Sequence, residues 1–581
     1  ADPYVERLLE GFAFLAARVQ LKIDAEFPRF TQHLLEIVYP HYLAPLPSMT
    51  VVQLQPDLQE GSLADGFPVP RDTKLRSVLG KDEQTACEYR TAHEVRLWPL
   101  ELTEAEYFSR DVATLHLPRL PNVRAGVRWR LRTTAGLKFN QLSLDSLPLY
   151  LRGSGDRAMR LYEQLFANAV AVAVRPAGRE PPWVDVLDKS QIHRVGFSDS
   201  EALLPYGPRS FQGYRLLQEY FAFPQRFLFV GIGGLAPSVR RCDQSELDVI
   251  VLLNRTDRML ENAIDAEDFS LFCTPAVNLF PKRADRIHLT DRSWDHHVVP
   301  DRTRPLDFEV YQVTSVTGYG VGDEDRQEFL PFYAAGDLTN GDDRGAYFTV
   351  RREPRVLSAK QQRQGPRTSY VGGEVFVALV DANETPYRHD LRQLGLETLC
   401  TNRDLPLTMP VGKSNTDFTL EVSAPVVSIR CLAGPTKPKP SPVFGPGDNA
   451  WRLISHLALN YLSITDQDER QGAAALRELL SLYSDYGEPA IARQIDGVRS
   501  VASSPVIRPV PTDGPMTFAR GVQVAVTCDE EAFEGTGVFL LGAVLERFFA
   551  KYVSLNSFTE TVIRTVGRGE IMRWPLRIGR R

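Results

Sequence analysis

The chain has 581 residues, which is too long for a single hydrophobic core and predicts about three to five structural units. Hydrophobic residues make up 43% and charged residues 24%, as in an ordinary folded protein, and the net charge of −6 argues against the basic face of a nucleic-acid binder. The six scattered cysteines include no CxxC pair and no apolar run approaches the roughly 20 residues of a membrane span, so we expect a cytosolic protein with reduced thiols, no signal peptide and no membrane insertion.

The amino-terminal end predicts an amphipathic helix. Asp2 can cap this helix and Pro3 suits its first turn. Apolar side chains then recur with the 3-4 spacing that places them on one face. This stripe consists of Val5, Leu8, Phe12, Leu15 and Val19. A second, shorter helix is expected between Pro28 and Pro40. Two helices at one end of a chain bury little surface between themselves, so the stripe needs a partner surface, from this chain or from another.

From about residue 48 the pattern changes to short strands between Pro, Gly and Asp turns. Helices are expected to interrupt these strands at 162–169 and 210–224. The expected strands include TVVQLQ (50–55), VRWRLRT (127–133), LPLYLRG (147–153), RFLFVGI (226–232), ELDVIVLL (246–253), FEVYQVTSV (308–316), YFTVRRE (347–353) and EVFVALVD (374–381). The middle of the chain is therefore predicted to be strand-rich.

A linker is indicated at 435–448, where PTKPKPSPVFGPGD contains five prolines. After it, helices are expected at 451–464, 475–486 and 537–558. The last of these is apolar on nearly every side, so we expect it to be buried mainly inside the C-terminal domain. Its narrow polar line is expected to face water or a partner, and consists of Glu546, Arg547 and Lys551.

Together these patterns predict a multidomain α+β fold. Its expected parts are an N-terminal helical arm (1–47), a strand-rich domain (48–205), a mixed, mainly strand domain with inserted helices (206–434), the Pro-rich linker (435–448) and a helix-rich C-terminal α+β domain (449–581).

The segment LETLCTNRDLP (396–406) raises the question of a nucleophile, because Cys400 is followed closely by Asn402, Arg403 and Asp404. A reactive thiol needs stabilisation of its thiolate and usually an adjacent base. No histidine lies nearby in the sequence, although members of a catalytic triad can be far apart in a chain. LETLC alternates as a strand does and TNRDLP has the composition of a turn. We therefore interpret the segment as a strand that runs into a turn, with Cys400 as a buried small hydrophobe.

The segment DRSWDHHVVPDR (291–302) is the most metal-like in the chain. Its nitrogen and oxygen ligands would come from Asp295, His296, His297 and Asp301. Adjacent histidines on a strand point to opposite faces, so only one of them could serve a given ion. A typical zinc site needs three or four convergent ligands. We interpret the segment as a polar strand edge, and keep as the alternative a metal-dependent hydrolase that uses Asp295, His297 and Asp301.

Other catalytic signatures are missing, since the sequence contains neither a GxxxxGK[ST] loop nor a GxSxG elbow. The C-terminal segment is basic, but Glu560 and Glu570 interrupt it. A protein contact or a salt-bridged surface explains it better than a nucleic-acid site. Its arginines are Arg564, Arg568, Arg573, Arg577, Arg580 and Arg581.

Nine segments along the chain carry a resemblance to a known family. They are DPYVERLLEGFAFLAARV (2–19), YPHYLAPLPSM (39–49), SFQGYRLLQEYFAFPQRF (210–227), TPAVNLFPK (274–282), VVPDRTRPLDFEVY (298–311), LCTNRDLP (399–406), WRLISHLALNYLS (451–463), GVFLLGAVLERFFAKYVSLNSFTE (537–560) and RGEIMRWPLRIGRR (568–581). Most are weak singly, but together and in this order they resemble the TssF family of type VI secretion baseplate subunits. Members of that family usually carry a helical segment before the point that matches Asp2, so we expect this chain to begin partway into the family pattern.

The resemblance implies a structural role without catalytic residues or cofactors. Family members pair with another copy of themselves and with TssG to build a wedge, and TssK binds this wedge and links it to the membrane complex. Several wedges surround the spike hub and support growth of the sheath and inner tube, as the wedge proteins of contractile phage tails do. The resemblance thus implies a cytoplasmic subunit docked at the inner membrane through a partner. The Val5–Val19 stripe is then expected to pack in a helical bundle with another chain.

Overall fold

The computed structural model shows a strand-rich α+β protein in which a closed barrel joins the other parts. The structure describes Arg18, Gln32, residues 34–36 and residues 40–578, apart from 59–60, 81–82, 110–119, 154, 206–211, 291–292, 321, 323–325, 333–344, 357–366, 382–386, 388–389, 445–472, 484–487, 511–516 and 551–556. No helix within these residues is long and apolar enough to cross a membrane.

The barrel is built from strands that are far apart in the sequence. In order around the barrel they are β1 (Met49–Pro56), β15 (Cys273–Val277), β4 (Glu88–Thr91), β3 (Lys74–Ser77), β24 (Phe418–Leu420) and β25 (Val426–Ala433), which returns to β1. All neighbours are antiparallel. Strands from both sides of the predicted boundary between residues 205 and 206 therefore belong to the same barrel. Residues 435–444 of the predicted linker run beside the start of β1, where Thr436 N donates to Met49 O (2.8 Å).

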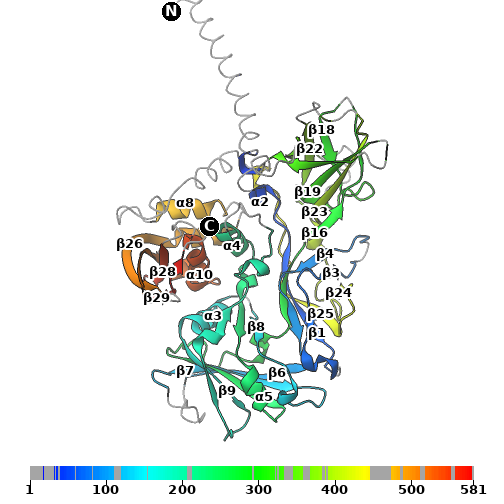
Figure 1. Cartoon of the computed structure of the whole chain (residues 1–581). Helices are drawn as coiled ribbons and strands as arrows, with labels where there is room; N and C mark the ends of the chain where they lie inside the picture. Colours follow the sequence, from blue (N-terminus) through cyan, green and yellow to red (C-terminus); the bar gives the residue numbers. More distant parts are fainter. Residues whose placement is uncertain are drawn as a thin grey trace, which may run out of the picture.

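Two further antiparallel sheets lie beside the barrel, below it in Figure 1. One has the order β10 (Asp185–Asp188), β9 (Ala169–Pro176), β13 (Glu246–Leu253), β7 (Ala125–Thr133) and β6 (Leu100–Phe108). The other has the order β11 (Ile192–Arg194), β12 (Phe229–Ile232), β8 (Leu147–Leu151) and β14 (Phe269–Ser270). Their helices are α3 (Asp156–Ala167), α4 (Gln212–Ala222) and α5 (Ala236–Arg241), and a small pair of strands joins β2 (Phe67–Val69) to β5 (Val95–Leu97).

Strand β7 illustrates how the sequence pattern becomes structure. Its apolar residues Trp129 and Leu131 are completely buried on one face. On the other face Arg130 donates from Nε to Asp248 Oδ1 of the neighbouring strand β13 (2.8 Å). The alternation in VRWRLRT thus separates a core face from a face of cross-strand ion pairs, as the period of two requires.

An eight-stranded sheet forms a separate lobe, at the upper right of Figure 1. This lobe has the order β16 (Phe280–Arg283), β23 (Gln393–Thr401), β19 (Glu309–Tyr319), β20 (Arg326–Pro331), β21 (Ala346–Pro354), β22 (Gly373–Asp381) and β18 (Asp295–Val298), with β17 (Ile287–His288) paired to β23. The lobe has its own apolar core, in which Val377, Leu394 and Leu396 are completely buried.

The C-terminal unit is a five-stranded sheet with helices, at the left of Figure 1. Its strands are β26 (Val498–Val510), β27 (Thr517–Cys528), β28 (Phe558–Thr565), β29 (Gly569–Arg573) and β30 (Arg577–Ile578), and its helices are α8 (Ala474–Ser481), α9 (Pro489–Asp496) and α10 (Val538–Phe549). β27 and β28 are parallel, and α10 is the crossover between them. The sequence predicted helices here, and the parts of them at α8 and α10 are confirmed. The sequence did not predict the long β26–β27 hairpin. The predicted helix at 451–464 lies outside the described residues.

Helix α10 ties the C-terminal unit to the rest of the molecule. Its Phe548 ring packs edge to face on Tyr214 of α4 (5.4 Å between centroids), and its Phe539 ring lies 5.9 Å from Tyr162 of α3. A single apolar core consequently runs through the barrel, both middle sheets and the C-terminal unit. The helix is buried as predicted, but against α3 and α4 as well as its own sheet.

The predicted outward direction of Glu546 is wrong. Glu546 is only 2% exposed and pairs with Arg577 and, at 3.6 Å, with Arg194 of β11. A carboxylate can occupy this buried position because cations from two other parts of the chain surround it.

Candidate functional site

The segment 396–406 is a strand and a turn, as the sequence predicted. Cys400 lies on β23, is completely buried, and has Thr398 Oγ1 3.2 Å from its sulfur. Burial raises the pKa of this thiol to about 12, although Thr398 acts in the opposite direction. A thiol that stays protonated at neutral pH is a poor nucleophile. The chain then turns at Arg403, whose φ of 54° is left-handed.

The turn residue Asn402 joins the lobe to the barrel. Its Oδ1 accepts hydrogen bonds from Glu88 N of β4 (2.8 Å) and from Asn278 Nδ2 (2.8 Å). Its own N–H donates to Asn278 Oδ1 (2.7 Å). Both asparagine side chains are almost completely buried. Such fully paired buried amides stabilise one particular arrangement of the elements that carry them.

Asp404 extends the same connection to the segment that precedes β22. It accepts hydrogen bonds from Arg367 (2.5 Å) and Thr368 Oγ1 (2.6 Å). Burial opposes ionisation, but these two bonds outweigh it and lower the pKa of Asp404. Next to this carboxylate, Leu405 reaches the main apolar core. We call the residues Asn402–Asp404, with Asn278, the junction turn; it fixes geometry and holds no reactive group.

The residues of the metal alternative do not converge. Asp295 pairs with Arg351 of the lobe (2.7 Å), and the His297 ring stacks on Phe376. Asp301 caps a turn by accepting from Thr303 N (3.0 Å) and Thr303 Oγ1 (2.6 Å). His296 points to the opposite, buried face of β18. Throughout the described part of the chain, no group of three or more Cys, His, Asp or Glu side chains could hold a metal ion. The hydrolase alternative is therefore not supported.

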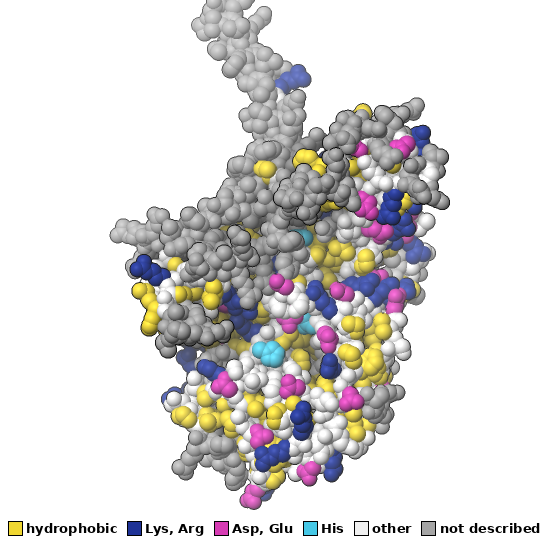
Figure 2. All heavy atoms as spheres, viewed as in Figure 1, with side chains coloured by type: hydrophobic (Ala, Val, Ile, Leu, Met, Phe, Trp, Pro, Cys, Tyr) yellow, Lys and Arg dark blue, Asp and Glu magenta, His cyan; other side chains and the backbone are white. Residues whose placement is uncertain are grey.

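The basic C-terminal segment is a salt-bridged surface, which confirms one of the two sequence interpretations. Arg573 binds Glu560 (3.0 Å) and Glu570 (2.9 Å). Arg568 pairs with Glu163 of α3 and with Glu530, and so crosses from the C-terminal unit to the middle of the chain. On the face shown in Figure 2, Lys and Arg side chains are interspersed with Asp and Glu. Arg580 and Arg581 lie outside the described residues.

A buried ion-pair network in α4 is the feature that sequence reasoning missed. Glu219, Arg215 and Arg226 are at most 2% exposed. Arg215 Nη1 lies 3.0 Å from both Glu219 oxygens, and Arg226 donates to Glu219 Oε2 from η6 (Pro224–Phe227). Glu219 Oε1 also accepts from two backbone N–H groups, of Leu203 and Leu204 (both 3.0 Å). The available signal was the Arg-x-x-x-Glu spacing on a helix whose other residues are mostly apolar or aromatic.

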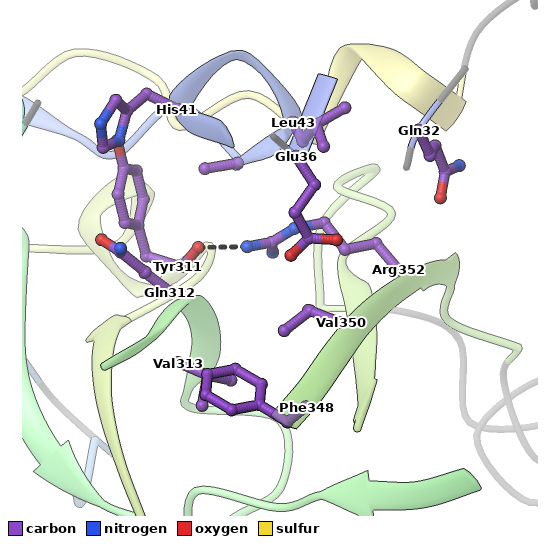
Figure 3. Close-up of a pocket in the computed structure, with 11 residues that line it drawn as sticks. Gln32, Glu36, His41, Leu43, Tyr311, Gln312, Val313, Phe348, Val350 and Arg352 are labelled. Carbon is purple, nitrogen blue, oxygen red and sulfur yellow. Dashed lines mark hydrogen bonds between the residues drawn. The ribbon is translucent and has the colours of Figure 1, made fainter. Parts of the chain in front are cut away.

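A second, half-buried ionic contact lies where the N-terminal segment meets the lobe (Figure 3). The Arg352 side chain of β21 donates to Val310 O (3.0 Å) and Tyr311 O, and the Glu36 carboxylate lies beside its guanidinium. Burial raises the pKa of Glu36 to about 7, against the opposing effect of Arg352. His41 lines the same cavity of about 30 Å³, and burial lowers its pKa to about 4.

The predicted partner-binding stripe, Val5, Leu8, Phe12, Leu15 and Val19, lies outside the described residues. Its packing therefore stays a prediction.

Known proteins match the chain over its whole length. A sequence model of the family described as "Type VI secretion system, TssF" matches residues 1–581. The type VI secretion system component TssF1 of Pseudomonas aeruginosa PAO1 is 60% identical over an alignment of 585 positions, which covers 100% of this chain and 93% of that protein.

Two solved structures share its fold. One is a chain in the cryo-electron microscopy structure of the type VI secretion system TssK-TssF-TssG baseplate subcomplex, with a TM-score of 0.73 and 26% identity over 99% of this chain and 100% of that one. The other, from the type VI secretion baseplate complex, has a TM-score of 0.58 and 22% identity over 100% of this chain and 93% of that one, and shows the fold alone.

The α4 network gives a prediction about stability. Glu219→Gln removes the carboxylate that Arg215 and Arg226 share and leaves two buried cations without it, so this change should lower the free energy of unfolding by about 3–5 kcal/mol in urea titrations. Glu328→Gln is the matched control, because Arg326 and Glu328 form an exposed pair (3.3 Å) whose loss should cost less than about 1 kcal/mol. Equal effects of the two changes would contradict the assigned role of the network.

The Glu36 contact gives a prediction about pH. The docked carboxyl has a pKa of about 7, above its ordinary value, so docking binds a proton and is favoured as the pH falls through 7. Between pH 8 and pH 6 the equilibrium constant for docking of the N-terminal segment on the lobe should rise about tenfold. Hydrogen exchange of the amides of residues 34–36 and 41–43 can measure this rise after correction for intrinsic rates. His41 stays neutral over this range. Glu36→Gln should abolish the dependence, and an unchanged dependence in that variant would refute the assignment.

Proposed function

Because the chain belongs to the TssF family of the type VI secretion system, we propose that it is a structural subunit of the baseplate wedge that joins TssG and TssK around the spike hub. In this role it supports assembly of the sheath and the inner tube. The proposed partners also include another copy of the chain and the components at the end of the sheath.

One observation carries the proposal above the others. The fold of nearly the whole chain superimposes on a chain of a solved TssK-TssF-TssG subcomplex, with a TM-score of 0.73 over 99% of its residues. The similarity is not confined to one domain that could be reused for another purpose. The similarity therefore extends to how the barrel, the lobe and the C-terminal unit are placed relative to one another. A structural subunit acts through such a placement, because it holds its partners in fixed positions.

We propose further that the chain turns over no substrate. The described residues that first suggested chemistry have structural partners: Cys400 is a buried, protonated thiol, and Asp295, His297 and Asp301 each serve a separate contact. The buried charges at Glu219 and Glu546 are paired with arginines. Paired, water-excluded charges suit a fixed architecture, whereas a general acid or base must reach a substrate.

The family resemblance also supports the proposed location, a cytoplasmic assembly docked at the inner membrane through a partner subunit. Residues 1–47 are proposed to be the helical arm, with its apolar stripe in a bundle that contains TssG. A stripe of large apolar side chains gains about 1.5–3 kcal/mol for each one that is fully buried, which explains how a terminal helix becomes stable only with a partner.

This proposal predicts the effect of placing charges in the stripe. Leu8→Asp together with Phe12→Asp should abolish co-purification with TssG, since two charges would have to be buried in an apolar contact. Glu6→Lys together with Glu10→Lys is the control, because both residues lie off the stripe. Thermal unfolding of both variants should match that of the parent protein, which shows that the barrel and lobe remain folded. Full recovery of TssG with the stripe variant would overturn the placement.

A further inference from the structure

A groove of about 860 Å³ lies where three parts of the chain meet. One wall comes from the end of α4 and the start of η6, around Phe221–Gln225. The second wall is the end of β25 with the segment after it, residues 432–439, and the third is the start of α9 between Glu488 and Gln494. The groove therefore spans the seam between the barrel and the C-terminal unit.

The floor of the groove is aromatic and apolar. Tyr220, Phe221, Phe223 and Ile491 line it and are each at most 5% exposed.

The rim of the groove is cationic. Arg152 and Lys437 are exposed on it, and Lys439 forms an ion pair with Glu488 (3.2 Å). Three cations thus face one carboxylate, on a chain whose net charge is −6. An apolar floor beneath an unbalanced positive rim is complementary to a segment that combines apolar side chains with aspartate or glutamate.

We propose that this groove binds an acidic segment of another baseplate subunit. The inference rests on the proposed assembly role and adds to it the chemistry of one contact. Such a segment, bound between β25, η6 and α9, would bridge the barrel and the C-terminal unit and couple their positions to assembly.

The test uses the full chain in its complex with TssG and TssK. Gln225→p-benzoylphenylalanine places a photo-cross-linker in the groove and leaves every cation in place. Irradiation of the purified complex should join it to a segment of another subunit in which Asp and Glu outnumber Lys and Arg, identified by mass spectrometry. Arg152→Glu together with Lys437→Glu should lower the cross-link yield about tenfold, the effect expected from losing two exposed ion pairs. Arg255→Glu together with Arg258→Glu, on exposed residues outside the groove, should not.

The possible results of this experiment distinguish a failure of the groove proposal from a failure of the proposed assembly role. A complex that forms but gives no cross-link to another subunit, or a cross-link to a segment without excess acid, overturns the groove proposal and leaves the assembly role standing. Equal yields in the two charge-reversed variants also overturn it. If the parent chain forms no complex with TssG and TssK, the assembly role fails and the groove proposal fails with it.

Discussion

The pairing of Asn402 with Asn278 is the contact on which the arrangement of the molecule depends most. It lies between a barrel and a lobe that have largely separate apolar cores, so non-directional burial alone leaves their relative orientation poorly defined. Hydrogen bonds are directional. The side-chain oxygen of Asn402 accepts hydrogen bonds from the backbone of β4 in the barrel and from Asn278. The neighbouring Asp404 accepts hydrogen bonds from Arg367 and Thr368 of the lobe. The junction turn therefore fixes the orientation of the lobe relative to the barrel.

Paired polar or charged side chains also lie at other junctions between parts of the chain. Glu546 of α10 meets Arg194 of β11, and Arg568 meets Glu163 of α3. Buried ion pairs contribute little net stability because both partners must be desolvated, but they discriminate strongly against displaced arrangements that would leave a charge unpaired. A subunit whose work is to hold neighbours at fixed positions gains from that property. Figure 1 shows the result, in which the barrel strands lie between the lobe and the two middle sheets.

Much of the fold could be predicted from periodicity, whereas the junctions could not. Short strand-like runs between turn residues identified β7, β13 and β22, and an apolar segment with a narrow polar line identified α10, because these signals are local. The alternation of LETLC and the turn composition of TNRDLP correctly predicted a strand that runs into a turn. Asn278 and Glu88, which bond Asn402, are more than 120 residues away from it, and two of the arginines that pair with Glu546 come from β11 and β30, so no local pattern reveals these contacts. The reading of Glu546 as outward-facing failed for that reason: a lone carboxylate on an apolar helix looks like a solvent contact until its distant cations are known.

The central claim is that the junction turn fixes the lobe on the barrel, and a distance measurement tests it most directly. Spin labels at Thr419→Cys on the barrel and Glu328→Cys on the lobe, both exposed, report the separation of the two bodies by double electron–electron resonance. The account predicts one narrow distance distribution, the same for the free chain and the assembled complex, and a broad distribution when Asn402→Ala is added. A broad distribution in the chain with Asn402 intact, or no broadening by Asn402→Ala, would contradict it.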